Sequence, residues 1–456
     1  MTPETPQSGH ATLDRRGEVT RGAGVAAATL DDVRAPARAG LPLRHVAAVA
    51  AGNALGFYDF LTYAFFAVPI GHTFFPSRDP ASSLLLSLAT FGAGFFTRPL
   101  GGIVIGILGD RKGRKPAMFV SFSLMGAAIV GMALTPSYRA IGIAAPILAI
   151  SFRLLQGFAL GGEVGPTTAY LIEAAHERNR GLFGSLQYAT QDLAILCAGL
   201  VGVALANILD ASALDAWGWR IAFLIGTAIV PFALLIRRQL PETLDERPPV
   251  RTTREPLRPH LRVALFGLLL LGSGTIASYV LIYMTTYATT TLHIASNYAF
   301  GATVVGGFCG VCFDPVSGWL SDRFGRKPVM MVPWALLFFA VLPVFMLMAH
   351  FRSAGALYAA TAAMQILVSL GSPAVVTAIT EALPPHIRSG ALSTIYAVAI
   401  STFGGTTQFV ITWLIARTGN PLAPAWYLMG AIVVGLVTMF AFEETAPAAV
   451  FSRRAR

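Results

Sequence analysis

Seven charged residues lie well inside long apolar stretches of this 456-residue chain. They are Asp59, Arg98, Arg153, Glu163, Asp192, Arg220 and Asp314. A charge at membrane depth costs about 3 kcal/mol on insertion scales, so such residues face a paired or hydrated interior. A guanidinium there can bind a carboxylate, and a buried carboxyl group can take up and release a proton. The pattern therefore indicates recognition of an anion together with proton transfer.

Arginine suits an anion because its guanidinium stays charged and can form two parallel hydrogen bonds to a carboxylate. Arg98 is the first candidate for a substrate carboxylate and Arg220 the second, although either could form a structural bridge instead. Arg153 fits a structural role as well as a functional one. The other polar residues that could bind the substrate are Asn53, Tyr58, Gln156, Gln187 and Gln191.

A buried carboxyl group can respond to an anion that occupies a neighbouring arginine. Glu163 and Asp59 are the candidates for proton coupling, against the alternative that both are permanently paired structural acids. Asp192 is a third candidate, on one helix face with Tyr188. Asp314 lies close to a loop motif, so we expect it at a helix end.

Helical rise places three of these charges at similar depth. Arg98 is twelve residues from Asp110 at a helix end, or about 18 Å, and Glu163 is ten residues from Glu173, or about 15 Å. Asp59 is about 22 Å from the basic start of its segment. We expect Arg98, Glu163 and Asp59 to meet in one central cavity.

The second half of the chain offers fewer polar residues at this depth. Tyr279, Tyr283 and Tyr287 recur every four residues, a stripe that more often packs a helix than binds a ligand. The sparse polar residues of two later helices are Gln365, Tyr396 and Gln408. We therefore expect the anion and proton chemistry in the first half.

Composition indicates the environment that holds these residues. Hydrophobic residues make up 55% of the chain and charged residues only 12%, whereas soluble domains carry about 25% charged residues. The apolar runs are long and continuous, which argues against a transmembrane barrel. No phosphate loop, nucleotide fingerprint or hydrolase motif is present, so we expect no enzyme, no cofactor and no metal site. The prediction is an all-α membrane protein.

Twelve apolar runs predict twelve transmembrane helices. They span residues 44–71, 83–109, 115–134, 140–172, 181–209, 218–238, 261–289, 296–322, 327–349, 353–383, 390–417 and 422–443. The polar segment 239–260 is a cytoplasmic linker between two six-helix bundles, residues 44–238 and 261–443. Residues 1–43 are predicted to be a disordered cytoplasmic tail, and 444–456 a second one.

The basic residues predict the orientation. Of the 33 Lys and Arg residues, 26 lie in the tails and in the loops on one side of the membrane. Four lie on the other side, namely Arg78, Arg139, Arg352 and Arg417. By the positive-inside rule both termini are cytoplasmic. This distribution also accounts for the net charge of +10 without nucleic acid.

Two motifs occur once in each half. The loop G-x-L-x-D-R-x-G-R-K follows the second and the eighth helix at an offset of 212 residues, and a Glu–Arg pair follows the fourth and the tenth at 208. The repetition indicates duplicated six-helix bundles whose charged loops act as a gate. The expected gate residues are Gly106, Asp110, Arg111, Arg114, Glu173, Arg180, Asp314, Gly318, Asp322, Arg323, Arg326, Glu381 and Arg388.

The twin loops resemble the loop signature of the major facilitator superfamily. Within it, residues 52–60, 97–102, 153–163 and 217–220 resemble the metabolite:proton symporters. Residues 70–76, 91–95 and 137–146 are similar to the citrate and tricarballylate branch. The resemblance covers residues 45–440 and is densest before 240. Gly56 departs from it, because the family usually has Glu there.

The resemblance implies a monomeric twelve-helix symporter of the major facilitator fold in a bacterial inner membrane. It would move a citrate-like di- or tricarboxylate with protons into the cytoplasm by alternating access. One alternative is a symporter of another solute, such as 2-oxoglutarate or a betaine- or proline-type zwitterion. A transporter-like receptor is an alternative of a different class, and the lack of an appended soluble domain argues against it.

Overall fold

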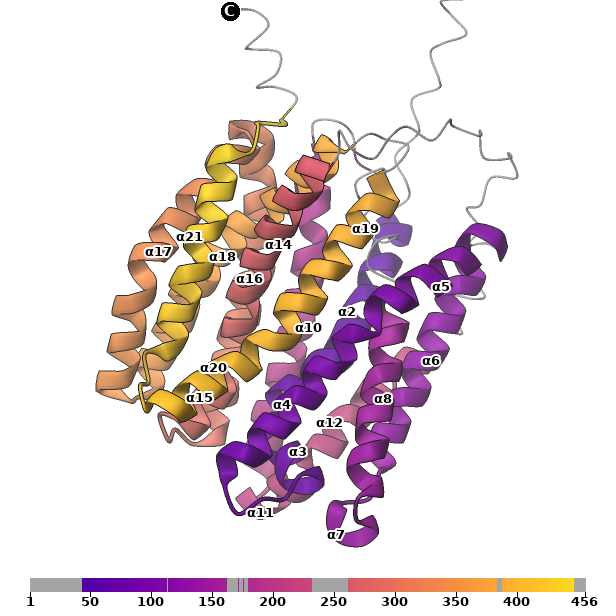
Figure 1. Ribbon diagram of the computed structural model, residues 1–456, viewed down its shortest axis with the longest axis vertical. Helices are drawn as coiled ribbons and strands as arrows, with labels where there is room; N and C mark the ends of the chain where they lie inside the picture. Colours follow the sequence, from indigo (N-terminus) through magenta and orange to yellow (C-terminus); the bar gives the residue numbers. More distant parts are fainter. Residues whose placement is uncertain are drawn as a thin grey trace, which may run out of the picture. The chain divides into compact units, whose positions relative to one another are not determined.

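The computed structural model describes residues 43–112, 114–161, 179–231, 261–383 and 388–446, with Leu171 and Ala175. Every regular element in these residues is helical (Figure 1). Ten of the described helices are long and apolar enough to cross a membrane, and the bent pair α2–α3 is an eleventh candidate. The predicted N-terminal tail up to residue 42, the linker 239–260 and residues 447–456 lie outside the described residues.

The helices of the first half follow the predicted spans, with two breaks. They are α2 (Leu43–Phe65), α3 (Ala67–Phe74), α4 (Pro80–Phe96), α5 (Arg98–Lys112), α6 (Arg114–Leu134), α7 (Tyr138–Ile141), α8 (Ala144–Gly161), α10 (Arg180–Ile208), α11 (Ala211–Ala213), a π-helical turn (Leu214–Gly218) and α12 (Trp219–Gly226). The axes of α2 and α3 meet at 66°. Thr97 separates α4 from α5 because Pro99 lacks a backbone N–H and favours the first turn of a new helix.

The second half repeats this pattern. Its helices are α14 (Leu261–Ile282), α15 (Met284–Thr290), α16 (Ser296–Phe324), α17 (Arg326–Phe351), α18 (Ala354–Ala382), α19 (Arg388–Ala399), a π-helical turn (Ile400–Gly404), α20 (Gly405–Thr418) and α21 (Ala423–Ala441). The predicted spans for α16, α17 and α18 agree within two residues. The predicted span 390–417 is divided by the π-helical turn, which the sequence analysis did not anticipate.

Glycines let the two halves approach backbone to backbone. A Cβ atom built on Gly199 of α10 would lie 2.8 Å from the backbone N of Val304, and one on Gly318 of α16 would lie 2.6 Å from the carbonyl O of Gly181. Small residues at such crossings permit close helix packing in membranes. In Figure 1, α10 and α16 run between α5, α6 and α8 on one side and α17, α18 and α21 on the other. Their interface therefore joins the halves.

Candidate functional site

A cavity of about 80 Å³, measured as the space open to the centres of water molecules, lies between the halves. It has room for several waters, since one needs about 10–15 Å³ on this measure. Helices α2, α5, α10, α14, α16, α18 and α19 supply its walls. Its polar lining includes Arg98, Tyr188, Gln191, Asp192, Tyr279, Asp314, Gln365, Ser369, Ser372 and Tyr396. The cavity therefore draws its polar groups from both halves.

Arg98 lies in the cavity wall at the break between α4 and α5. Its side chain is only 3% exposed, and its guanidinium carbon lies 4.2 Å from the ring centroids of both Phe60 and Phe95. The Nε and Nη2 groups of Arg98 have no hydrogen-bond partner in the described part of the chain. Two aromatic faces thus hold a buried cation whose N–H groups remain available to an anion.

Asp59 of α2 lies near Arg153 of α8, outside the cavity lining. Both residues are fully buried, and neither carboxylate oxygen of Asp59 has a hydrogen-bond partner among the described residues. Arg153 Nη1 donates to Gln156 Oε1 at 2.6 Å, and its guanidinium carbon lies 4.4 Å from the ring centroid of Phe60. We had expected Asp59 and Arg98 to meet in one cavity, but Asp59 does not line the cavity that holds Arg98. Instead, the ring of Phe60 contacts both arginines.

Asp192 and Asp314 come together across the α10–α16 interface. Gln365 Nε2 donates to Asp192 Oδ2 at 3.0 Å, and the two carboxyl groups lie within hydrogen-bonding reach of each other. Asp314 is 1% exposed, and its Oδ2 has no other partner in the described residues. Asp314 was expected at a helix end with the gate. The structure corrects this, because Asp314 lines the cavity beside Asp192.

Arg220 does not reach the cavity. Its Nη1 donates to the carbonyl oxygens of Ala133 and Thr135 at 2.6 and 2.7 Å, and its guanidinium carbon lies 4.3 Å from the ring centroid of Trp219. Carbonyl groups at a helix C-terminus lack helical partners, and a cation there is favourable. Arg220 therefore caps the end of α6, and the expectation that it faces the substrate beside Arg98 is corrected.

Of the other expected binding residues, some join helices to one another and one lines the cavity. Asn53 Nδ2 donates to Thr190 Oγ1 at 2.7 Å, and Gln187 Nε2 donates to Asn53 Oδ1 at 3.3 Å, so both join α2 to α10. Tyr58 donates its hydroxyl hydrogen to the carbonyl O of Ala222. Of the five, Gln191 alone lines the cavity.

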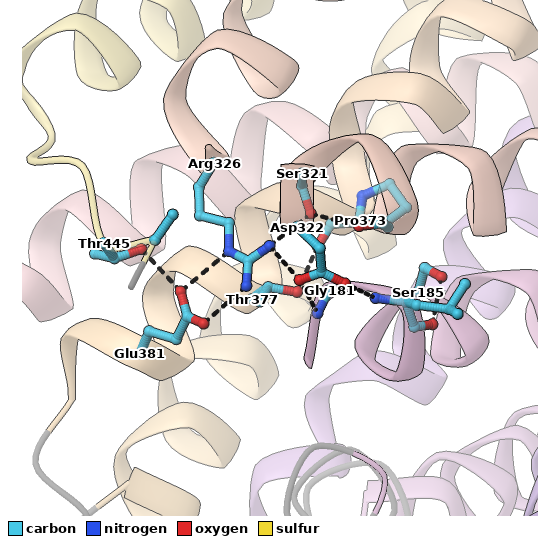
Figure 2. Close-up of polar contacts among 12 residues, drawn as sticks. Gly181, Ser185, Ser321, Asp322, Arg326, Pro373, Thr377, Glu381 and Thr445 are labelled. Atoms are coloured by element: carbon cyan, nitrogen blue, oxygen red, sulfur yellow. Dashed lines mark hydrogen bonds and ion pairs between the residues drawn. The ribbon is translucent and has the colours of Figure 1, made fainter. Parts of the chain in front are cut away.

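Charged side chains close the end of the bundle where α16 gives way to α17, here named the gate end (Figure 2). Asp322 accepts hydrogen bonds from the backbone N–H groups of Gly181 and Leu182 at 2.9 and 3.0 Å, so a second-half carboxylate caps a first-half helix. Arg326 Nη1 lies 2.8 Å from Asp322 Oδ1, and Arg326 Nη2 lies 2.9 Å from Glu381 Oε1. The network therefore ties α10, α16 and α18 together.

Comparison with known proteins identifies the family. Residues 45–245 and 263–447 match the family model described as "Sugar (and other) transporter". The chain is 34% identical over 419 residues to the citrate-proton symporter of Klebsiella pneumoniae, covering 90% of this chain and 94% of that one. It is 32% identical over 421 residues to the proline/betaine transporter of Escherichia coli K12, covering 88% and 83%.

The chain belongs to the sugar (and other) transporter family. Among solved structures, a D-xylose-proton symporter superposes with a TM-score of 0.72 at 17% identity, covering 88% of this chain and 98% of that one. The prediction of an all-α membrane protein with the major facilitator fold is thus confirmed. The protein is a multi-pass membrane transporter and not an enzyme.

Several expected residues of this transporter lie outside the described residues. They are Glu163 and Glu173, together with the side chains of Asp110, Arg111, Arg114 and Arg388. Gly106 lies in α5. Arg180 begins α10. Arg323 lies over the rings of Trp319 and Phe324 and takes no part in the network drawn in Figure 2. The described gate is therefore the second-half copy of the motif.

Sequence reasoning named Gln365 but missed Thr361 and Ser369, which complete the polar face of α18 in this transporter. Thr361, Gln365 and Ser369 line the cavity at spacings of four residues, which place them on one helix face. This spacing was the available signal, but small hydroxyl groups in apolar helices often bond their own backbone, so they are weak evidence for a site.

Glu444 was also missed in the sequence. Its carboxylate accepts hydrogen bonds from the backbone N–H groups of Arg326 and Lys327 and caps α17.

Proposed function

We propose that this transporter is a proton-coupled symporter of citrate-like di- or tricarboxylates. The observation that carries the proposal is Arg98, a guanidinium with 3% exposure whose Nε and Nη2 groups have no partner among the described residues, in a cavity between the halves. Leaving a buried donor without a partner is costly, and a substrate carboxylate would satisfy it with charge-assisted hydrogen bonds. The similarity to a citrate-proton symporter over nine-tenths of the chain supports the same substrate class.

Proton coupling follows from the two arginines that contact Phe60. Arg153 interacts electrostatically with Asp59, and we propose that Arg98, which contacts the same Phe60 ring from the cavity side, adds to the positive potential there. A substrate anion on Arg98 cancels part of that potential. Asp59 then binds a proton more readily, so anion and proton load together. This is the linkage that symport requires.

Alternating access would use the gate end and the opposite end in turn. We propose that the gate end is cytoplasmic, because the loops on that side carry most of the basic residues. The Asp322 carboxylate would leave the backbone N–H groups of Gly181 and Leu182 when the cavity opens to the cytoplasm. These hydrogen bonds bridge the halves, whereas Arg326 holds Asp322 and Glu381 together within the second half. Each chain has its own cavity between its two halves, so we propose that the transporter acts as a monomer.

A betaine- or proline-type zwitterion is the second candidate substrate. Arg98 faces a cavity that also holds two carboxyl groups and three tyrosines, Tyr188, Tyr279 and Tyr396. Aromatic faces and carboxylates attract a quaternary ammonium, so this cavity has a place for each end of a zwitterion. The similarity to a proline/betaine transporter points the same way.

Uptake into proteoliposomes tests the proposal. Purified transporter is reconstituted, a pH gradient acidic outside is imposed, and accumulation of radiolabelled citrate is followed with and without a protonophore. We expect accumulation that the protonophore abolishes and that unlabelled tricarballylate inhibits. Unlabelled 2-oxoglutarate, glycine betaine and proline are added as competitors. Accumulation of labelled betaine with no effect of citrate or tricarballylate would replace the first candidate by the second.

A further inference from the structure

We infer that Asp192 and Asp314 share one bound proton, and that this protonated pair holds α10 against α16. The inference deepens the proposed function, on which its role in transport rests, by adding a proton site between the halves. It is separate from Asp59, which lies with Arg153 outside the cavity lining.

The two carboxyl groups line one cavity and interact with each other, which favours a shared proton. Asp192 belongs to the first half and Asp314 to the second, and their carboxyl groups lie within hydrogen-bonding reach inside a closed interface. Two ionised carboxylates in such contact repel each other, whereas a carboxylic acid can donate a hydrogen bond to a carboxylate. Neither carboxyl group has an ion-pair partner among the described residues.

The surroundings of the pair are built for this contact. A Cβ atom at Gly310 would collide with the Asp192 carboxylate, so the glycine lets that carboxylate reach the α16 backbone one turn before Asp314. Besides Arg98 Nε, Arg98 Nη2 and Gln191 Nε2, three polar atoms lining the same cavity have no hydrogen-bond partner among the described residues. They are Asp314 Oδ2, Thr361 Oγ1 and Ser372 Oγ, in side chains that are at most 4% exposed. The pocket therefore offers free hydrogen-bonding positions beside the pair.

The pair is the titrating centre of the cavity. The other ionisable groups around it are Tyr188 on α10, Cys309 on α16, Tyr279 on α14 and Tyr396 on α19, with Arg98 on α5. Phenols and thiols ordinarily remain neutral and guanidinium remains charged between pH 5 and 7. Gln365 and Ser369 on α18 complete the wall and carry no charge. A change of charge in this range therefore falls on the two carboxyl groups.

Because each half supplies one carboxyl group, proton loss and separation of the halves are linked. The shared proton stabilises the α10–α16 contact, and its departure leaves two charges that favour moving apart. Opening hydrates both carboxyl groups and lets the proton exchange with water. The pair thereby ties the proton to the conformational step, whereas Asp59 ties a proton to the substrate.

A distance measurement tests this directly. Spin labels are placed at Asn207→Cys on α10 and Tyr298→Cys on α16, both exposed positions, after replacement of Cys197, Cys309 and Cys312. We expect the inter-label distance to lengthen between pH 5 and pH 8. In Asp314→Asn, whose amide can donate permanently to Asp192, the short distance should persist at every pH. Asp192→Asn should also lose the pH response. Asp215→Asn, the same change outside the cavity, should keep it.

Further arms separate the explanations. Gly310→Ala retains both carboxyl groups but pushes the Asp192 side chain away from Asp314, so it should also remove the pH response. This variant provides the test if the Asn variants fold poorly. An unchanged pH response in all three cavity variants, or none in the parent, would overturn the inference. A distance that follows sodium concentration at fixed pH would overturn it in favour of a metal cation. Asp59→Asn should keep the pH response of the distance. If the parent protein shows this pH response but does not take up citrate, only the proposed substrate is rejected.

Discussion

Two buried arginines contact the ring of Phe60, and they differ in whether they reach the cavity. Both have Nε and Nη2 groups without a hydrogen-bond partner among the described residues, but Arg153 Nη1 donates to Gln156 and only Arg98 lies in the cavity wall. Arg220 is different again, because it donates to two backbone carbonyl groups. The three residues are alike in sequence, each an arginine within an apolar run. Their partners in space assign them different roles.

Arg98→Lys should weaken substrate binding although it keeps the positive charge. A lysine cannot offer the planar pair of N–H groups or stack between Phe60 and Phe95 in the same way. Losing one charge-assisted hydrogen bond is worth about 1.5–3 kcal/mol, or about 10- to 150-fold in Kd. Calorimetric titration with citrate measures this, with Arg417→Lys at an exposed helix end as the matched control. Equal Kd values for the parent, Arg98→Lys and a folded Arg98→Ala would reject the site.

Arg220→Ala should lower stability and leave substrate affinity unchanged. The substitution exposes the carbonyl groups that end α6, and a cation at a helix C-terminus contributes about 0.3–1 kcal/mol, rising to about 2 in partly buried sites. Thermal unfolding in detergent should show a lower Tm, and citrate titration should show a Kd within about twofold of the parent. A large rise in Kd at unchanged Tm would return Arg220 to the substrate site.

Asp59→Asn should uncouple substrate movement from the proton gradient. An amide cannot bind the proton that the substrate anion promotes, so net accumulation should be lost while exchange of external for internal citrate continues. Glu163→Gln, the other candidate acid, is measured in parallel. Counterflow and gradient-driven uptake in the same proteoliposomes separate the two activities. If both variants accumulate citrate normally and keep its pH dependence, neither acid couples the proton.

At the scale of helices, the sequence was sufficient to predict the long membrane-spanning segments, because apolar runs bounded by charges are strongly determined. It did not predict the short helices α3, α7, α11 and α15 or the two π-helical turns. The breaks were harder. The Pro99 signal after Thr97 was present but not used, and the π-helical turn in Ile400–Gly404 has no sequence mark that we recognise. The contacts within the site were also harder to predict than the helices. The depth estimate agrees with Arg98 lying in the cavity wall, but depth gives no information on helix rotation, which places Asp59 near Arg153. Asp314 was misplaced because its nearness to the loop motif suggested a helix end, whereas it lies beside Asp192 in the cavity.

Gly318→Ala tests the helix contact at the gate end. A methyl group there would lie 2.6 Å from the carbonyl O of Gly181, so α16 must move away from α10. A shift of about 1.4 kcal/mol toward the open form raises its population relative to the closed form about tenfold. In a protein whose only cysteine is Ser372→Cys in the cavity, that cysteine should then react about ten times faster with a small thiol reagent than it does when Gly318 is present. Gly430→Ala, with open space around its Cα, is the matched control. Equal rates in both variants would show that this contact does not control opening.

For the whole molecule, the cavity lies between two halves, so it could not be predicted from the residues of the first half alone. Its walls are shared, and Asp314, Gln365 and Ser369 come from the second half. The internal repeat predicted two similar bundles but not which faces would meet. Glycines at the crossings, such as Gly199 and Gly318, determine that meeting. Function at this scale depends on the interface, since each half supplies only part of the site.

The orientation of the whole molecule is the final prediction, and it rests on charge. Twenty-six basic residues are predicted for the cytoplasmic side and four for the other, a bias that sets topology during insertion. In cells expressing a cysteine-free transporter, Tyr138→Cys at the end opposite the gate should react with an impermeant maleimide added outside. Phe324→Cys at the gate end, also exposed, should react only after permeabilisation. Blocking by a second impermeant thiol reagent verifies the specificity of labelling. The reverse pattern would place the gate outside and make the Asp322 network the extracellular closure.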